Sequence, residues 1–288
     1  MQIIDGKKIR DEILKGIKVE VSKLSFVPVF CDVLVGDDPA SIQYVEMKKK
    51  MAEMVGIHFH TANFKANITN EKLVKEIQML NVVKNMCGII VQLPLPKSID
   101  QQTILNSINP KLDVDCLSAL VSENFYKSYD GSIDLGYPTA LACMAILDSL
   151  NLDLTVKNMV VLGQGMLVGK PVAALLKSRG LEPVVIRSKT EGKEELIKEA
   201  DIIISGMGKG KYIKGDMIKK GAVLIDAGTS ESMEPSTEGE MSNSIVGDVD
   251  LNSVKDVASY VSPVPGGVGP VTVAILLKNV LQVAKNIN

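Results

Sequence analysis

Apolar positions in the first half of the chain alternate between helical and strand spacing. Apolar residues from Ile9 to Leu24 recur every three or four positions, which predicts an amphipathic helix, and a strand follows at 27–35. The same reasoning predicts a helix from Ser41 as N-cap to Gly56, a strand at 58–64, a helix at 69–80 capped by Thr69, and a buried strand at 88–93. Strands separated by helices indicate a mainly parallel sheet covered by helices.

The second half repeats this alternation after a polar, glycine-containing stretch at 123–138, which is typical of a crossing between domains. The pattern predicts helices at 139–150, 171–178 and 193–200, and strands at 159–162, 183–186, 201–205, 222–226 and 258–261. Residues 229–244 are expected to form an exposed loop. A long apolar helix at 271–284 is expected to pack back onto the first domain. We therefore predict an α/β protein with two domains around a cleft, formed by residues 1–138 with 265–288 and by residues 139–264.

Composition and charge narrow the class of protein. The 288 residues are 46% hydrophobic and 23% charged, with a net charge of −2, which is typical of a globular protein and predicts neither nucleic acid nor membrane as a partner. Four widely spaced cysteines and two histidines favour neither disulfides nor a metal site. The charged N-terminus lacks a signal-peptide pattern, and the longest apolar runs are shorter than a bilayer needs, so a cytoplasmic location is expected.

A glycine-rich loop follows the predicted strand at 159–162 and precedes a helix that opens with Pro171. Glycines there allow a tight turn and close approach of the backbone to a pyrophosphate, and the helix N-terminus favours negative charge. The spacing of Gly163, Gly165 and Gly169 is GxGxxxG instead of GxGxxG. The motif alone is therefore weak evidence, and the alternative is that the glycines only end a strand.

The strand that follows ends in a basic turn. An NAD site usually has a carboxylate about twenty residues after the glycine loop, where it binds the ribose 2′-hydroxyl. This chain has Arg187, Ser188, Lys189 and Thr190 there. Two cations and two hydroxyls suit a 2′-phosphate, which favours NADP over NAD. The alternative is a turn that only faces solvent.

Four residues of the first half could carry chemistry. Tyr44 and Lys48 are four apart and so lie on one face of a helix, although such pairs are common on surfaces. Gln92 ends a buried strand, where ligands gather in open α/β sheets, but a glutamine can also cap a strand. Asp113 and Asp115 are carboxylates on alternate residues, and a loop or N-cap pair is the simpler interpretation.

Taken in order, these motifs resemble the bifunctional methylenetetrahydrofolate dehydrogenase/methenyltetrahydrofolate cyclohydrolase family over nearly the whole chain. The resemblance includes VLVGDDPAS at 33–41, the Tyr44–Lys48 pair, VQLPLP at 91–96, DVD at 113–115, VGKP at 168–171 and VGDVD at 246–250. It ends with PVPGGVGP at 263–270. This octapeptide and VQLPLP are long and unusual strings, and they are much more specific than the glycine loop.

The resemblance implies NADP-dependent oxidation of 5,10-methylenetetrahydrofolate to the 5,10-methenyl cation and its hydrolysis to 10-formyltetrahydrofolate, in one-carbon metabolism and purine biosynthesis. The folate/catalytic domain would be 1–138 with 265–288, and 139–264 would be a Rossmann-type NADP domain. Lys48 must be an unprotonated amine for part of the cycle, and neutral Gln92 can hydrogen-bond it. Tyr44 would offer its ring and hydroxyl to the folate, and Asp115 would accept pterin N–H groups.

Further site residues follow from the same resemblance. The catalytic set is Lys48, Tyr44, Gln92 and Asp115, and the substrate-binding set adds Leu93, Pro94, Pro265, Gly266 and Gly267. The cofactor set is Thr139, Gly163, Gln164, Gly165, Met166, Val168, Gly169, Arg187, Ser188, Lys189, Gly228 and Thr229. The resemblance also implies a homodimer joined through the nucleotide domains, and it implies no metal.

Several positions depart from the family pattern near the expected ligands. Leu112 and Cys116 stand where a lysine and a glycine are usual, and 118–121 and 137–140 lack most of the expected residues. Tyr44, Lys48, Gln92 and Asp115 are retained. Two alternatives to the bifunctional enzyme therefore stay open: a folate- or nucleotide-binding module of the same fold with reduced catalysis, or a protein with dehydrogenase activity alone.

Overall fold

The computed structural model describes residues 1–128, 135–235 and 241–287, and the chain divides into two compact units. The six-stranded unit contains Met1–Arg10 and Thr139–Thr272, and the three-stranded unit contains Asp11–Pro138 and Val273–Asn288. This division differs from the predicted domains, which placed residues 1–10 and 265–272 with the first domain. The first residues join the six-stranded unit because Gln2 and Ile3 pair in parallel with Tyr260 and Val261.

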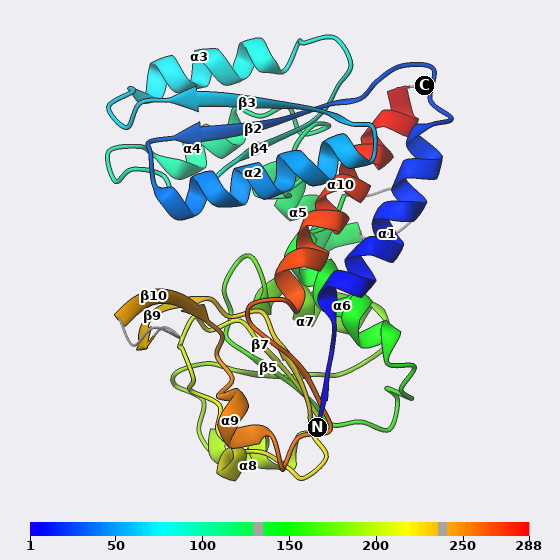
Figure 1. The fold of residues 1–288 in the computed structure, drawn as a ribbon, viewed down its shortest axis with the longest axis vertical. Helices are drawn as coiled ribbons and strands as arrows, with labels where there is room; N and C mark the ends of the chain where they lie inside the picture. The colour runs from blue at the N-terminus through cyan, green and yellow to red at the C-terminus, as the bar shows by residue number, and fades with distance from the viewer. Residues whose placement is uncertain (129–134, 236–240, 288) are drawn as a thin grey trace. The chain divides into compact units, whose positions relative to one another are not determined.

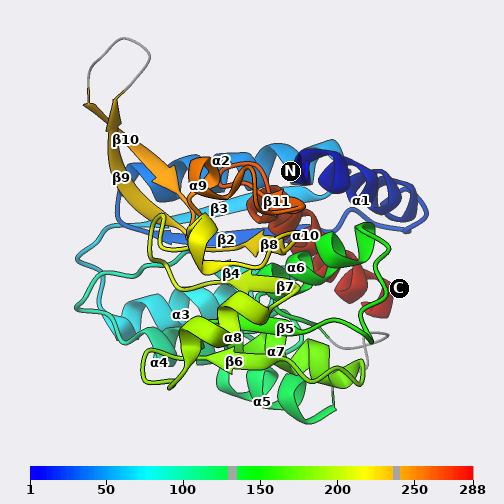
Figure 2. The same cartoon turned by 90° about the horizontal axis from the view of Figure 1, so that it is seen from below.

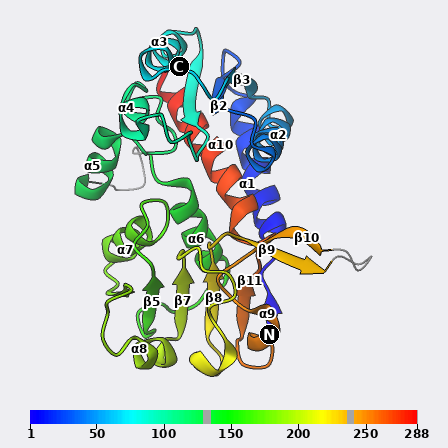
Figure 3. The ribbon, with the colours of Figure 1, turned by 90° about the vertical axis from the view of Figure 1, so that its left-hand side faces the viewer.

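The three-stranded unit is a parallel sheet with helices on both sides. Its strand order is β3-β2-β4, and both pairings are parallel, as predicted from the sequence. Helices α2 and α3 flank opposite sides of this sheet (Figures 1 and 3), as expected for right-handed crossovers. The elements are α1 (Gly6–Val21), β2 (Val29–Val35), α2 (Pro39–Met54), β3 (His58–Phe64), α3 (Asn70–Leu80), β4 (Met86–Val91), α4 (Gln101–Asn106), α5 (Ala119–Ser128) and α10 (Val268–Ile287).

Side-chain caps fix where two of these helices begin. The Thr69 hydroxyl accepts the Lys72 amide, so the predicted N-cap of α3 is confirmed. The predicted N-cap of α2, Ser41, is wrong: Asp38 is the cap, and its carboxylate accepts the Ser41 amide at 2.8 Å. Helix α2 can start three residues earlier because Pro39 is well suited to the first helical position.

The C-terminal helix α10 returns to the three-stranded unit, as predicted. The buried Asn279 amide donates to the carbonyl oxygens of Val114 and Gly136, both at 2.8 Å. Lys285 also pairs with Glu20 of α1 at 2.5 Å. By length and composition α10 could cross a membrane, but 67% of its apolar 18-residue window is buried inside the structure. This burial is typical of a core helix.

The six-stranded unit is a fully parallel sheet of the Rossmann type. Its strand order is β1-β11-β8-β7-β5-β6, and every neighbouring pair is parallel. Figure 3 shows β5, β7, β8 and β11 with their carboxyl ends at one edge. The elements are β1 (Gln2–Ile3), α6 (Pro138–Ser149), β5 (Met159–Leu162), α7 (Gly169–Ser178), β6 (Val184–Ile186), α8 (Lys193–Glu199), β7 (Ile202–Ser205), a 3₁₀ turn (Gly215–Met217), β8 (Val223–Asp226), α9 (Leu251–Val254) and β11 (Tyr260–Ser262).

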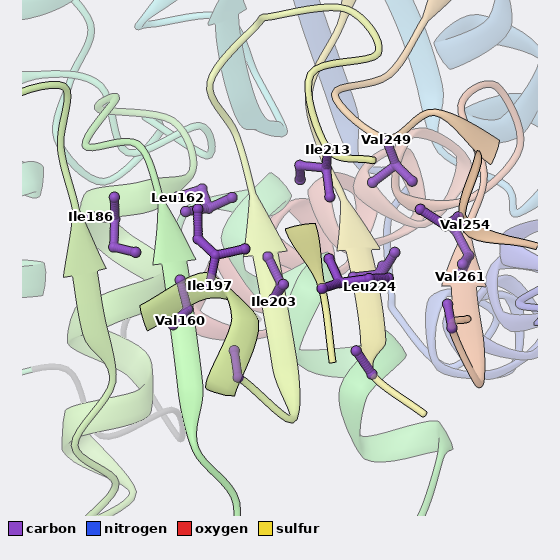
Figure 4. Packing of buried hydrophobic residues seen from close by; sticks show 14 residues of the cluster. Val160, Leu162, Ile186, Ile197, Ile203, Ile213, Leu224, Val249, Val254 and Val261 are labelled. Carbon is purple, nitrogen blue, oxygen red and sulfur yellow. The ribbon is translucent and has the colours of Figure 1, made fainter. Parts of the chain in front are cut away.

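An apolar cluster on one face of this sheet holds the unit together. Val160, Ile203 and Leu224 are register partners on β5, β7 and β8, and they line up across the strands in Figure 4. Ile197 of α8 and Val254 of α9 pack on the same cluster. The strand carboxyl ends, and the loops that follow them, are therefore carried on a rigid support.

Residues 229–244, expected to form an exposed loop, instead include an antiparallel hairpin. Strand β9 (Ser230–Pro235) pairs with β10 (Met241–Val246), and the hairpin projects from its unit in Figure 2. The polar composition of these residues led to the prediction of a loop, because it lacks the apolar alternation by which a strand is predicted. Part of the predicted domain crossing at 123–138 also forms helix α5, and residues 129–134 of it lie outside the described residues.

Candidate active site

A buried lysine is the centre of the site in the three-stranded unit. The buried positions of α2 are Ser41, Val45, Lys48, Met51 and Ala52, which form the stripe that faces the sheet. Lys48 therefore occupies a position where the helical pattern requires an apolar residue, and it is only 1% exposed. Lysine is almost never fully buried unless it is paired. This burial indicates that the ammonium group is held inside the protein by specific partners.

Gln92 and Tyr44 are two of these partners, as the sequence predicted. The Lys48 ammonium donates to Gln92 Oε1 at 2.8 Å. The Gln92 side-chain amide in turn donates to the Leu93 carbonyl at 2.7 Å, which leaves its oxygen turned to the lysine. The Tyr44 ring centroid lies 4.9 Å from Lys48 Nζ, within the range of a cation–π contact.

A third partner, Asp32, was missed by the sequence analysis. Its Oδ2 lies 2.5 Å from Lys48 Nζ, and its side chain is completely buried within β2. Among the described residues, no donor other than Lys48 reaches either carboxylate oxygen. The available signal was a single acidic residue inside the otherwise apolar strand VFCDVLV. Such a residue needs a buried partner, and Lys48 provides it.

Asp115 lies in the same electrostatic environment, and its pKa is raised to about 7. The main cause is burial, with a further contribution from the negative charge of Asp113, while Lys48 acts in the opposite direction. The adjacent Asp113 is a structural residue, because its carboxylate accepts the Ser118 amide at 2.8 Å. Near neutral pH Asp115 is therefore divided between a neutral acid and an anion, and the anion is the form that can accept N–H donors from a ligand.

The backbone at Cys116 explains how this end of the site accepts a cysteine where the sequence comparison expects a glycine. Cys116 has φ of +61°, the left-handed conformation that glycine adopts most easily, so the backbone keeps the geometry that the family's glycine would give.

Burial raises the pKa of the Tyr44 phenol, and the charges of Asp115 and Asp32 add to this effect. The phenol therefore stays protonated and can donate a hydrogen bond.

The remaining predicted substrate residues fall in both units. Leu93 and Pro94 follow Gln92 directly, joined by a cis peptide bond. Pro265, Gly266 and Gly267 belong to the six-stranded unit, where the Gly266 carbonyl accepts the Gly6 amide at 3.1 Å. A Cβ at Gly6 would collide with the Gly267 carbonyl, so this turn also holds the N-terminal segment. Folate contacts by these five residues stay predictions.

The glycine loop of the six-stranded unit follows β5, where the strand order reverses. Gly163 has φ of +97°, and its amide donates to the Ile186 carbonyl at 3.0 Å. A Cβ on Gly169 would collide with the Gly163 carbonyl, so Gly169 lets helix and strand pack closely. A Cβ on Gly165 would meet no heavy atom closer than Gly206 O at 4.0 Å. The first and last glycines are thus needed by the fold, and the middle one leaves open space.

This loop fits the pyrophosphate of a dinucleotide. Helix α7 begins at Gly169 after Val168, and no side chain caps its first amides. Gln164, Gly165 and Met166 are exposed beside it. The Lys170 amide donates to the Gly165 carbonyl at 3.2 Å and Pro171 has no N–H, so the Gly169 amide is the one in this first turn that is left for a phosphate group. The positive end of the helix dipole also favours a phosphate there, and open α/β sheets bind ligands where the strand order reverses.

The basic turn lies next to this loop because β5 and β6 are neighbours in register, with Leu162 opposite Ile186. Arg187, Ser188 and Lys189 are exposed there, and the Arg187 amide donates to the Thr190 hydroxyl at 2.9 Å. The turn is thus ordered by Thr190, while the two cations and the Ser188 hydroxyl face outward. These groups fit the extra phosphate that distinguishes NADP from NAD.

Two buried carboxylates order the neighbouring loops after β7 and β8, and the sequence analysis assigned them no role. Asp248 accepts the Ser205 hydroxyl at 2.6 Å and the amides of Met207 and Lys209. Asp226 accepts the amides of Gly228, Asp248 and Val249, and burial raises its pKa to about 6. Gly228 therefore lies in this network and Thr229 is exposed next to it, whereas Thr139 lies in the first turn of α6. Cofactor contacts by Gly228, Thr229 and Thr139 stay predictions.

Comparison with known proteins agrees with this geometry. Residues 4–115 match the model of the tetrahydrofolate dehydrogenase/cyclohydrolase catalytic domain, and residues 137–288 match that of its NAD(P)-binding domain. A bifunctional protein FolD from Nitratiruptor sp. is 41% identical, over 99% of this chain and 98% of its own. Bifunctional FolD from Campylobacter jejuni is 34% identical with a TM-score of 0.90, covering 100% of both chains. The Trypanosoma brucei enzyme, solved with NADP cofactor and an inhibitor, is 33% identical with a TM-score of 0.92, covering 100% of this chain and 98% of its own.

Proposed function

This chain belongs to the tetrahydrofolate dehydrogenase/cyclohydrolase family, and from that membership we propose how its own side chains carry out the family's two reactions. The protein is an NADP-dependent 5,10-methylenetetrahydrofolate dehydrogenase and 5,10-methenyltetrahydrofolate cyclohydrolase of one-carbon metabolism. The observation that supports the residue roles best is the buried Lys48 ammonium, hydrogen-bonded to Gln92.

Lys48 is the base for hydrolysis of the methenyl cation. Water adds its oxygen to the one-carbon unit, and a water proton moves to the Lys48 amine, which becomes an ammonium. The carbon–nitrogen bond to N5 then breaks, and N5 takes that proton back from Lys48. The second water proton leaves to solvent as the formyl group forms, so the reaction releases one proton overall. Gln92 keeps the lysine nitrogen in place throughout, because its amide oxygen accepts one ammonium or amine N–H.

Asp115 and Tyr44 bind and orient the folate. As an anion, Asp115 accepts hydrogen bonds from N–H groups of the pterin ring. These hydrogen bonds in turn stabilise the anionic form of Asp115. The Tyr44 ring offers an apolar face, and its protonated hydroxyl can donate to the reacting region. Both residues lie in the electrostatic environment of Lys48, which affects the pKa of Asp115, while Asp115 affects that of Tyr44.

For the oxidation, the protein supplies binding and orientation. NADP, when bound, accepts the hydride of the one-carbon unit. The glycine loop around Gly165 and the Gly169 amide at the start of α7 would hold its pyrophosphate, and Arg187, Ser188 and Lys189 would bind its 2′-phosphate. Intact contacts at Lys48 favour the bifunctional enzyme over a binding module or a dehydrogenase alone. The homodimer, the cytoplasmic location, and the absence of nucleic acid and membrane partners stay predictions.

Two absorbance assays on the purified protein test this proposal. NADPH formation from methylenetetrahydrofolate reports the oxidation, and decay of added methenyltetrahydrofolate above its spontaneous rate reports the hydrolysis. Both activities should be present, with NADP used better than NAD. Folate binding with no turnover by either nucleotide would instead support the binding module, and oxidation without hydrolysis would support the dehydrogenase alone.

A further inference from the structure

Asp32 is a buried acid that neither the fold nor the proposed function explains. It lies in the middle of β2, the central strand of its sheet, opposite Thr61 of β3 and Ile90 of β4. Its side chain is fully buried. A carboxylate at this position loses its hydration, and the cost is several kcal/mol unless partners replace the water.

The partner that Asp32 has is the base of the proposed reaction. Lys48 Nζ lies 2.5 Å from Asp32 Oδ2, and Lys48 also donates to Gln92 Oε1. Lys48 is the only donor to Asp32 among the described residues, so the carboxylate is poorly compensated. A buried ion pair of this kind is weak evidence for a stabilising role, since apolar residues in the same place are often as stable.

The environment favours transfer of a proton within the pair. An ammonium next to a carboxylate and an amine next to a carboxylic acid hold the same number of protons, but only the second form carries no charges. Burial raises the pKa of the Asp32 carboxyl, and the facing Lys48 charge opposes this shift only in part. A short contact between two buried side chains therefore brings the two forms close in energy.

We propose that Asp32 is a positioning residue that takes a proton from Lys48 and so presents the lysine as a free amine to the water that attacks the methenyl group. The inference rests on the proposed function of Lys48. Within the pair, the Lys48 N–H bond breaks and an O–H bond forms on Asp32, with no proton released to solvent and no change in net charge. The freed amine can then accept the proton of the attacking water, and Asp32 keeps its own proton during that step.

In any test, the titration of neighbouring groups must be distinguished from that of Asp32 and Lys48. Tyr44 faces it from α2, Asp115 from the segment after β4, and Cys31 is next to Asp32 in β2. Burial raises the pKa of Cys31 to about 12, and that of Tyr44 is also raised, so both stay protonated in the working range. Asp115 titrates near neutral pH, so the profiles are also measured in an Asp115→Asn background.

The test is the pH profile of methenyltetrahydrofolate hydrolysis in Asp32→Asn, which keeps the shape of the side chain and removes its charge and proton-accepting oxygen. A neutral amide next to Lys48 resembles the protonated Asp32 of the proposed pair, but it cannot take a proton from the lysine. The acidic midpoint of kcat should therefore stay in place or move to higher pH, with KM changed less than threefold. Asp37→Asn, on the exposed loop after β2, is the matched control and should leave the midpoint in place. A folded Asp32→Asn protein whose midpoint moves to lower pH by one unit or more overturns the proposal, because an ammonium held by an ionised Asp32 gives that shift.

A second measurement keeps the proposal testable if Asp32→Asn does not fold. Carboxyl-carbon NMR of the wild-type protein labelled at aspartate reports the Asp32 signal, identified by its response to Lys48→Met. We expect Asp32 to become ionised well above the ordinary aspartate range, and at still higher pH in Lys48→Met. An Asp32 signal that is fully ionised from pH 4 upward rules out the proton transfer. If Lys48→Met itself still hydrolyses the substrate normally, the proposed function fails, whereas a failure of the Asp32 tests alone leaves that function standing.

Discussion

The Lys48 ammonium nitrogen lies 2.8 Å from Gln92 Oε1, although the two residues are 44 positions apart in the chain. Lys48 comes from α2 and Gln92 follows the last residue of β4. The parallel pairing of β2 with β4 brings them together, because the Gln92 amide donates to Val33 and extends that ladder by one residue. The position of the base thus depends on the register of the sheet.

Replacing the lysine should affect hydrolysis without affecting cofactor binding. Lys48→Met keeps a long apolar side chain in a buried position and removes the base, so hydrolysis of methenyltetrahydrofolate should fall by about 10²–10⁴-fold. Affinity for NADP, measured by titration calorimetry, should change less than twofold. Lys50→Met, an exposed position on the same helix, is the control and should keep both properties. Wild-type hydrolysis by Lys48→Met would remove the lysine from the mechanism.

Replacing the arginine of the basic turn should change cofactor preference. A charge-assisted hydrogen bond is worth about 1.5–3 kcal/mol, so Arg187→Ala should weaken NADP binding by roughly 10- to 100-fold. Binding of NAD should hardly change, because NAD lacks the 2′-phosphate. Lys177→Ala removes an exposed cation from the end of α7 and serves as the control in the same calorimetric titrations. Equal weakening of both nucleotides by Arg187→Ala would mean that the turn only faces solvent.

Two glycines of one loop should respond differently to alanine. Gly165→Ala meets open space, so thermal stability should hardly change, while its methyl group occupies room expected for the phosphate and weakens NADP binding. Gly169→Ala collides with the Gly163 carbonyl and should lower both stability and NADP affinity. Differential scanning calorimetry with and without NADP distinguishes the two effects. An equally destabilised Gly165→Ala would show that the middle glycine is also required by the fold.

Asp115 should make stability depend on pH. Its pKa rises from the ordinary 3.8 to about 7 in the folded protein, so between these values the folded chain binds a proton that the unfolded chain has released. This contribution to stability is complete below pH 4 and is lost as pH rises through about 7. The free energy of unfolding of wild type should therefore fall relative to Asp115→Asn over this range and stay level above it. Urea unfolding at pH 5, 6, 7 and 8 measures this, and a constant difference would contradict the raised pKa.

The C-terminal helix should depend on one buried amide. Asn279→Leu removes the donor to the carbonyls of Val114 and Gly136 and leaves two acceptors without that partner. The unsatisfied groups cost about 1–3 kcal/mol each, so the free energy of urea unfolding should fall by a few kcal/mol. Lys278, exposed on the same helix, gives the control Lys278→Leu, which should cost less. If both variants lose the same stability, the Asn279 bonds are not what anchors the helix.

Local patterns predicted most of the fold, and long-range pairings account for what they missed. The α3 cap and the strands at 159–162 and 58–64 follow from neighbouring residues alone. The pairing of Gln2 with Tyr260 leaves no local trace, because a two-residue edge strand has no periodicity. In the site, the lysine and glutamine could be identified from motifs. Asp32 could not be assigned a role, since its importance depends on the distance to Lys48 in three dimensions.

Each of the two units is built from two segments that are far apart in the chain. The six-stranded sheet is completed at one edge by residues that precede all of its other strands in the chain, and the three-stranded unit is closed by residues 273–287, which follow all of its strands. During synthesis on the ribosome, the lysine site is therefore assembled long before the helix that anchors its surroundings emerges from the exit tunnel. In that interval the face of the nascent sheet around Gly88, which Val280 contacts in the folded protein, is exposed. Chaperones that bind exposed apolar surface would have a defined target there.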